Sequence, residues 1–334
     1  MKAASHSALR AGPLLLAAVV GLGVTLRAPL GTTVIGLIVF GVLHNLFELR
    51  YLAGRFVLGR LSSRLAWLLA APILAVVLVR ASTGLGLSPA VARQAEIALV
   101  YGSLGLAALT ADRPAPLRAG LVAIVAIAGA ASWTWVSSHY LILVHLHNLM
   151  PIVFLWLHRA ENRGAVLAAC AVWGLLIPAA LLSGVLDPLL DFSAALSAGP
   201  VGPEEAARLR GGWSTPTTMP DQVTRIAATF SFLQWMHYFI WIFYLPRFSS
   251  PPTETHRLWR HFFGPVGFGV ALVATVALVP LYLSDYIRGF TTYGTLAAFH
   301  ALVEFPVLLA VLLLPASEAE ARADEAVLTR DSAL

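Results

Sequence analysis

The chain has 334 residues, of which 58% are hydrophobic and 12% charged, and its mean hydropathy is +0.79. Soluble domains carry about 25% charged residues, so this composition excludes an ordinary soluble protein. The single cysteine, Cys170, excludes an internal disulfide and a thiolate metal cluster. We assign the net charge of +5 to loops that orient membrane helices, not to nucleic-acid binding. The sequence therefore predicts an all-α, polytopic protein of the lipid bilayer.

A helix needs about 20 mostly apolar residues to cross the hydrocarbon core of a membrane. The chain contains ten such runs, of which the third and fourth are the weakest. The first is followed by Arg27-Ala-Pro instead of a small-residue cleavage site, so we interpret it as a retained helix and not a signal peptide. The predicted helices cover 11–28, 30–50, 65–80, 94–111, 116–134, 138–158, 164–186, 223–246, 263–285 and 293–315.

Basic residues predict how the helices are oriented. With ten spans, fifteen of the twenty-two lysine and arginine residues fall on the side that holds both termini. Positive charge marks the cytoplasmic side, so we expect both termini to be cytoplasmic and the protein to lie in the cell (inner) membrane. We expect one transmembrane domain over 1–315 and a polar cytoplasmic tail over 316–334. The long outer loop over 187–222 is a solvated connector or, in a sharper interpretation, a lid on the membrane surface.

Histidines are concentrated in the even-numbered predicted helices. Ionisable side chains inside a bilayer are costly, so each one points to a function or to a partner. Five of the ten histidines lie deep in predicted helices, and all of these helices run in the same direction. These five are His44, His145, His147, His237 and His300. The pattern predicts a shared site among His44, His147, His237 and His300, which requires four helices that are not consecutive to be neighbours.

Two of these histidines are followed four residues later by glutamate, as His44-x-x-x-Glu48 and His300-x-x-x-Glu304. This spacing puts an imidazole and a carboxylate on one helical face. Nitrogen and oxygen ligands of this kind suit iron, zinc, manganese or copper(II), and we expect iron. We expect Glu304 to be a metal ligand. Both glutamates are candidate catalytic residues, as ligands or as proton carriers. Glu48 has an alternative partner in Arg50, whereas Glu304 has no basic neighbour in sequence. We therefore expect the loss of Glu304 to be the more damaging.

Further candidates lie on the same helices. His145 and His147 are about 200° apart around a helix, so both cannot face one point. We expect His147 to face the metal, with His145 in a supporting or cofactor-binding position. Tyr140, two turns above His147, is a candidate catalytic residue. Gln234, one turn before His237, is a candidate for binding a ligand or water.

These residues favour a metal-dependent oxidoreductase that acts on a lipid-soluble substrate, with dioxygen as a suitable oxidant. One alternative is a haem protein with histidine axial ligands. The segment from Tyr140 to His147 resembles the His-x-His helix of the haem–copper oxidase main subunit over about one helix, but the His-His pair and the His-Pro-x-x-x-Tyr helix of that family are missing. The other alternative is a proton-coupled or metal-ion transporter with a His/Glu relay. The sequence names neither the substrate nor the oligomeric state.

Overall fold

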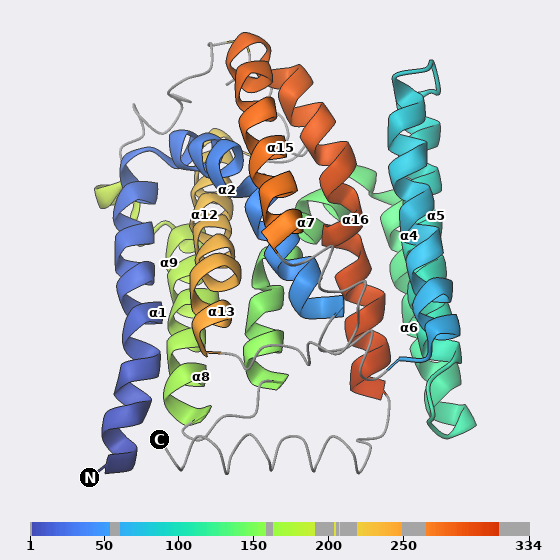
Figure 1. The fold of residues 1–334 in the computed structure, drawn as a ribbon, viewed down its shortest axis with the longest axis horizontal. Helices are drawn as coiled ribbons and strands as arrows, with labels where there is room; N and C mark the ends of the chain where they lie inside the picture. Colours follow the sequence, from blue (N-terminus) through green and yellow to red (C-terminus); the bar gives the residue numbers. More distant parts are fainter. Residues whose placement is uncertain are drawn as a thin grey trace.

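Helices account for all regular secondary structure in the described part of the chain. The computed structural model describes residues 2–53, 61–157, 163–190, 219–248 and 265–313, together with residues 204 and 207. The protein is an all-α polytopic bundle, which confirms the fold predicted from hydropathy. In chain order the main helices, shown in Figure 1, are α1 (Lys2–Arg27), α2 (Pro29–Leu52), α4 (Ser63–Thr83), α5 (Pro89–Leu109), α6 (Ala115–Thr134), α7 (Val136–Leu157), α8 (Arg163–Ala171), α9 (Ile177–Ser183), α12 (Pro220–Phe239), α13 (Leu245–Phe248), α15 (Pro265–Ser284) and α16 (Tyr286–Leu313).

Four of these helices form two longer spans, and each of these spans contains a π-helical turn. The turn η2 (Val172–Leu176) joins α8 to α9, and η4 (Ile240–Tyr244) joins α12 to α13. A π turn places an extra residue in the helix and occurs often at functional sites. The turn η4 begins three residues after His237, at Ile240. The wider turn therefore lies directly beside one of the four histidines.

Eight helical segments in the described residues are long and apolar enough to cross a membrane, so the protein is a multi-pass membrane protein. The two predicted spans that do not meet this measure are the first and the fourth. The apolar part of α1 covers only Ala11–Arg27. Helix α5 carries Arg93, Gln94 and Glu96 in its N-terminal half, and these residues reduce its mean hydropathy. Helix α5 thus needs a partner for its charged residues.

Two helices begin earlier than predicted because local capping, and not hydropathy, sets where they start. Helix α5 begins at Pro89, not at 94, and proline is well suited to the first turn of a helix. Helix α16 begins at Tyr286, not at 293. Here the Asp285 carboxylate accepts a hydrogen bond from the backbone N–H of Arg288 at 2.9 Å. A search for apolar runs misses these polar first turns.

The helices that carry the four histidines lie in the middle of the bundle. In Figure 1, α1, α8 and α9 lie on one side and α4, α5 and α6 on the other, with α2, α7, α12 and α16 between them. Helix α12 packs against α1, α2, α7 and α9, and α16 packs against α2, α4, α5 and α15. These two helices are also the most enclosed of the spans, with 72% and 61% of their apolar windows buried. His237 of α12 and His300 and Glu304 of α16 are accordingly enclosed by protein.

Three predictions fall largely or wholly outside the described residues. Of the outer loop 187–222, the structure gives a short 3-10 turn at Asp187–Leu189 and the start of α12. An ion pair between Arg225 Nη2 of α12 and Asp187 Oδ2 at 2.5 Å joins this turn to the helix that follows the loop. The rest of the loop, 191–218 except residues 204 and 207, on which the lid interpretation depends, and the tail 316–334 lie outside the described part. The single-domain organisation and the cytoplasmic location of the termini remain predictions.

Candidate metal centre

The four histidines come together in the middle of the bundle. His44 lies on α2, His147 on α7, His237 on α12 and His300 on α16. The ring centroids are 4.4 Å apart for His147 and His237, and 5.0 Å apart for His44 and His300. The centroid of His237 is 5.2 Å from that of His44. His44, His237 and His300 are each at most 3% exposed, and the His147 side chain is 13% exposed. Four helices thus bring imidazoles to one enclosed place.

Hydrogen bonds to neighbouring groups orient two of these rings. His44 Nδ1 donates to the Phe40 carbonyl oxygen at 3.1 Å, since a carbonyl can only accept. His147 Nδ1 donates to Glu304 Oε1 at 2.6 Å. In both rings the N–H at Nδ1 leaves the lone pair on Nε2, which is the form of histidine that binds a metal. The pairing of His147 with Glu304 is the carboxylate–histidine arrangement that commonly supports a metal ligand.

Glu48 and His237 face each other without a hydrogen bond. Glu48 Oε2 is 3.3 Å from His237 Nε2, and both side chains are fully buried. Even so, both carboxylate oxygens of Glu48 and both ring nitrogens of His237 lack a hydrogen-bond partner among the described residues. Buried polar atoms without partners are costly. These nitrogen and oxygen atoms lie close together but are not aligned for hydrogen bonding. A metal ion bound between them would be a suitable partner for both.

The residues with the most suitable donor spacing are His44, Glu48, His147 and His237. Each offers one donor atom, and these atoms all lie within 4.8 Å of one another. Two ligands on opposite sides of one ion are about 4.2 Å apart, because nitrogen and oxygen ligands bind at about 2.1 Å. Small side-chain adjustments would bring the set to coordination distance. This His/Glu group could therefore hold a metal ion.

The remaining two members of the cluster lie next to this group. His300 Nε2 donates a hydrogen bond to His44 Nε2 at 3.2 Å, since His44 carries its proton on Nδ1. His300 Nδ1 has no partner among the described residues. Glu304 uses Oε1 to accept the bond from His147, while its Oε2 is buried without a partner. The geometry thus gives Glu304 an orienting contact to a candidate ligand and gives Glu48 the closer approach to the donor set. The ion pair of Glu48 among described residues is with His237, not with Arg50.

The charge of the cluster also fits a cation. Glu48 and Glu304 are both fully buried, and the ion pairs given for them are with His237 and His147. An isolated carboxylate is very unfavourable in a low-dielectric interior. A histidine compensates it only when protonated, and a protonated imidazole cannot be a ligand. A divalent cation would balance both carboxylates while the rings stay neutral.

The other predicted residues surround the cluster. His145 is turned away from it, with Nδ1 donating to the Leu141 carbonyl at 2.7 Å and its ring 5.7 Å from that of Phe230. Gln234 Nε2 donates to the Tyr238 hydroxyl at 2.7 Å, and its Oε1 has no partner among the described residues. The hydroxyl of Tyr140 is likewise buried without a partner there. None of these three belongs to the donor group.

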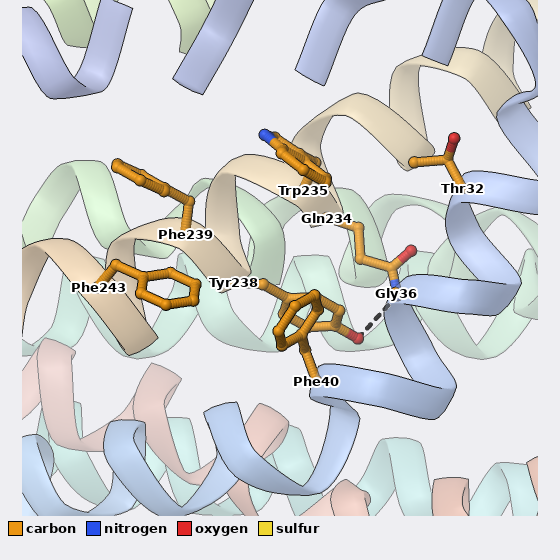
Figure 2. Close-up of a pocket in the computed structure, with 8 residues that line it drawn as sticks. All are labelled: Thr32, Gly36, Phe40, Gln234, Trp235, Tyr238, Phe239 and Phe243. Carbon is orange, nitrogen blue, oxygen red and sulfur yellow. Dashed lines mark hydrogen bonds between the residues drawn. The ribbon is translucent and has the colours of Figure 1, made fainter. Parts of the chain in front are cut away.

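Tyr238 is a residue that the sequence analysis does not single out, although it contacts the histidines directly. Its ring lies 4.3 Å from that of His44, centroid to centroid. Figure 2 shows its hydroxyl bonded to Gln234, with Phe40 beside it, in a small apolar pocket between α2 and α12. The pocket holds about 60 Å³ and is also lined by Gly36. The signal was present in the sequence, since Tyr238 and Gln234 are four residues apart on one helical face.

A larger cavity adjoins the histidines. It holds about 210 Å³, and His44, His147 and His300 form part of its wall. Much of the remaining wall is apolar, but it also contains the polar side chains of Arg80, Tyr140, Asn148, Gln234, Tyr238 and Tyr293. The apolar part of the wall consists of Leu37, Leu143, Val144, Phe230, Phe290, Ala297, Ala298, Ala301 and Leu302. Metal-ligating groups and space for an apolar molecule thus lie side by side.

Arg80 is a further residue that sequence reasoning missed. It forms two hydrogen bonds to Glu96, from Nε at 2.9 Å and from Nη2 at 2.5 Å, and a third from Nη1 to the Gly294 carbonyl at 2.9 Å. The rule that a charge within a membrane helix points to a function or to a partner applies to Arg80 and to Glu96 alike.

Comparisons of the chain with protein-family models, with curated proteins and with solved structures find no match.

Proposed function

We propose that the protein is a membrane-embedded oxidoreductase in which a non-haem iron ion, held by histidine and glutamate, acts on a lipid-soluble substrate with dioxygen as oxidant. One observation carries the proposal: donor atoms of His44, Glu48, His147 and His237 lie within 4.8 Å of one another beside a largely apolar cavity of about 210 Å³. Of these atoms, those of Glu48 and His237 are buried without a hydrogen-bond partner among the described residues. In this proposal His44, Glu48, His147 and His237 are ligands, with His300 as a further one. Glu304 orients His147 through its 2.6 Å bond.

The donor chemistry supports iron. Imidazole and carboxylate without thiolate suit iron, copper(II), manganese and zinc. Zinc has no redox chemistry of its own, so an oxidoreductase requires one of the others. Imidazole combined with carboxylate is typical of non-haem iron(II) sites that react with dioxygen. Bound iron would supply electron transfer to the oxidant, while the surrounding apolar side chains keep water away from the reaction.

The close packing of the rings favours a bare ion over haem. The two axial histidines of a haem lie on opposite faces of the macrocycle and are separated by it. Here His44 and His300 are in direct contact, with Nε2 atoms 3.2 Å apart, and the His147 ring lies 4.4 Å from that of His237. A macrocycle would have to separate these rings, whereas a single ion fits among them.

The position of the cavity supports a substrate that enters from the bilayer. Its wall is formed in part by α7 and α16, including Val144 and Phe290. These two side chains are 36% and 41% exposed, so they also reach the outer surface of the bundle, where lipid would lie. A molecule dissolved in the membrane would thus reach His147 and His300 without passing through water.

Metal analysis together with an absorption spectrum of the purified protein tests the proposal. We expect stoichiometric iron and no Soret band. The variant His237→Ala removes a fully buried member of the donor group, so its iron content should fall to background while the protein remains folded.

His139→Ala provides the matched control. His139 is also a buried histidine of the bundle, at 5% exposed, but its Nδ1 bonds the Ser132 hydroxyl at 3.0 Å and it lies outside the donor group. It should keep its iron. An intense Soret band would replace the proposal by the haem alternative. Protein that contains neither metal nor haem, even after anaerobic iron loading, would favour the transporter.

A further inference from the structure

The large cavity has a second polar end, remote from the histidines. Tyr140 precedes His147 by seven residues on α7, and Gly294, whose carbonyl binds Arg80, precedes His300 by six residues on α16. At 1.5 Å per residue, both positions are roughly 10 Å from the histidines along their helices. Arg80, Tyr140 and Gly294 all line the cavity. The cavity therefore has the histidines at one end and Arg80 with Tyr140 at the other. The rest of its wall is apolar except for Asn148, Gln234, Tyr238, Tyr293 and the backbone of Gly294.

The charge at this second end is already balanced. Arg80 forms a bidentate pair with Glu96, and its remaining nitrogen donates to the Gly294 carbonyl. Glu96 is 3% exposed, so the pair is largely enclosed. A ligand with a charged carboxylate would bring a second anion next to Glu96 and leave one of the two without a counterion. A neutral end group avoids this cost.

Tyr140 offers the hydrogen bond that such an end group needs. Its buried hydroxyl lies near the Glu96 carboxylate but is not aligned for a hydrogen bond with it or with another described residue. A buried hydroxyl without a partner is unfavourable, and an oxygen atom of a ligand would relieve it. Tyr101, on the adjacent helix α5, differs in this respect because its hydroxyl bonds Ser132 at 2.7 Å and it does not line the cavity.

We propose that the cavity binds an elongated apolar molecule with a neutral oxygen end group, a hydroxyl or a carbonyl, which hydrogen-bonds Tyr140. Bound in this way, the molecule presents to His44, His147 and His300 the carbon atoms that lie roughly 10 Å from its oxygen. This substrate class rests on the proposed oxidoreductase function for its chemical meaning. The binding itself depends only on the cavity and on Tyr140.

Ligand binding to the full chain in lipid nanodiscs tests this inference, with empty nanodiscs used to subtract partition into lipid. The probes are radiolabelled decan-1-ol, decanoic acid and decane, which share a chain length and differ in their end group. We expect the wild type to bind decan-1-ol about tenfold more tightly than decane, as expected for one buried hydrogen bond. Tyr140→Phe should abolish this preference, whereas the control Tyr101→Phe should keep it.

Each remaining outcome contradicts the inference in a defined way. Equal binding of decan-1-ol and decane by the wild type, or an unchanged preference in Tyr140→Phe, would exclude Tyr140 as the recognition group. Tighter binding of decanoic acid would show that a charged group is recognised instead. Metal content measured on the same samples separates this inference from the proposed function. Metal-free protein that prefers the alcohol supports the inference alone, and iron-loaded protein without the preference supports the function alone.

Discussion

The two His-x-x-x-Glu turns have the same spacing but different surroundings. On α2, Glu48 lies 3.3 Å from His237 of α12, and its oxygens have no hydrogen-bond partner among the described residues. On α16, Glu304 accepts a 2.6 Å hydrogen bond from His147 of α7. The spacing places the imidazole and the carboxylate on one face in both helices, but the helix packed opposite decides what the carboxylate does. The comparison teaches that one motif can direct its carboxylate toward an unpartnered histidine in one helix and toward a hydrogen-bonded histidine in another.

The largest expected effect is that of Glu48→Gln. Glutamine keeps the size of the side chain but removes the negative charge that offsets a cation in a low dielectric. We expect metal affinity to fall by more than the roughly 100-fold that is typical for losing a supporting contact. Iron content after purification, followed by a titration against a chelator, measures this. Wild-type affinity in Glu48→Gln would exclude Glu48 as a ligand.

A smaller loss is expected for Glu304→Gln. The hydrogen bond to His147 is weakened, not removed, and the loss of an orienting contact typically costs about 10- to 100-fold in affinity or activity. From sequence alone Glu304 ranks above Glu48, and the geometry reverses that order. The same chelator titration compares the two variants directly. If Glu304→Gln binds metal more weakly than Glu48→Gln, the roles assigned to the two turns must be exchanged.

Tyr238→Phe should have a modest effect that leaves metal binding intact. The hydroxyl accepts a 2.7 Å bond from Gln234, and the ring packs 4.3 Å from that of His44. Phenylalanine keeps the ring contact and removes the hydrogen bond, whose net contribution to stability is about 1 kcal/mol. Thermal unfolding should show a small decrease in stability, and iron content should not change. Loss of iron in this variant would mean that the hydroxyl itself supports the metal.

The smallest effect is expected for His145→Gln. His145 lies two residues from His147, but its Nδ1 bonds the Leu141 carbonyl and the residue is not in the donor group. Iron content and chelator resistance should match the wild type, in contrast to a His147→Gln variant. A loss of iron equal to that of His147→Gln would place His145 in the site and would require α7 to be rotated.

Much of this arrangement follows from the sequence, because depth in a membrane can be inferred from hydropathy. Ten apolar runs predict the ten long helical segments of the described residues, and the positions of His44, His237 and His300 within those runs predict burial. Rotation about the helix axis is harder to predict. The choice between Arg50 and His237 as partner of Glu48 depends on how α2 packs against α12, which is a contact between residues far apart in the chain.

The cavity could not be predicted for the same reason. Its wall combines residues of α2, α4, α7, α12 and α16, and no local pattern records which side chains leave space between helices. The start of α16 shows a different limit. The cap at Asp285 sets that boundary, while Arg288 makes the first turn look like a loop on any hydropathy measure.

The pairing of Arg80 with Glu96 has a consequence for how the chain enters the membrane during synthesis. Helix α5 is not apolar enough to be recognised as a span by itself, and a lone charged residue at the centre of a helix costs about 2.5–3.5 kcal/mol on insertion. Helices α4 and α5 pack against each other, and Arg80 near the end of α4 neutralises Glu96 of α5. The two helices therefore insert most favourably together as one hairpin, because Arg80 of α4 then neutralises Glu96 of α5 within the bilayer. Substitution of Arg80 would act at this step of biogenesis, before any metal or substrate is bound.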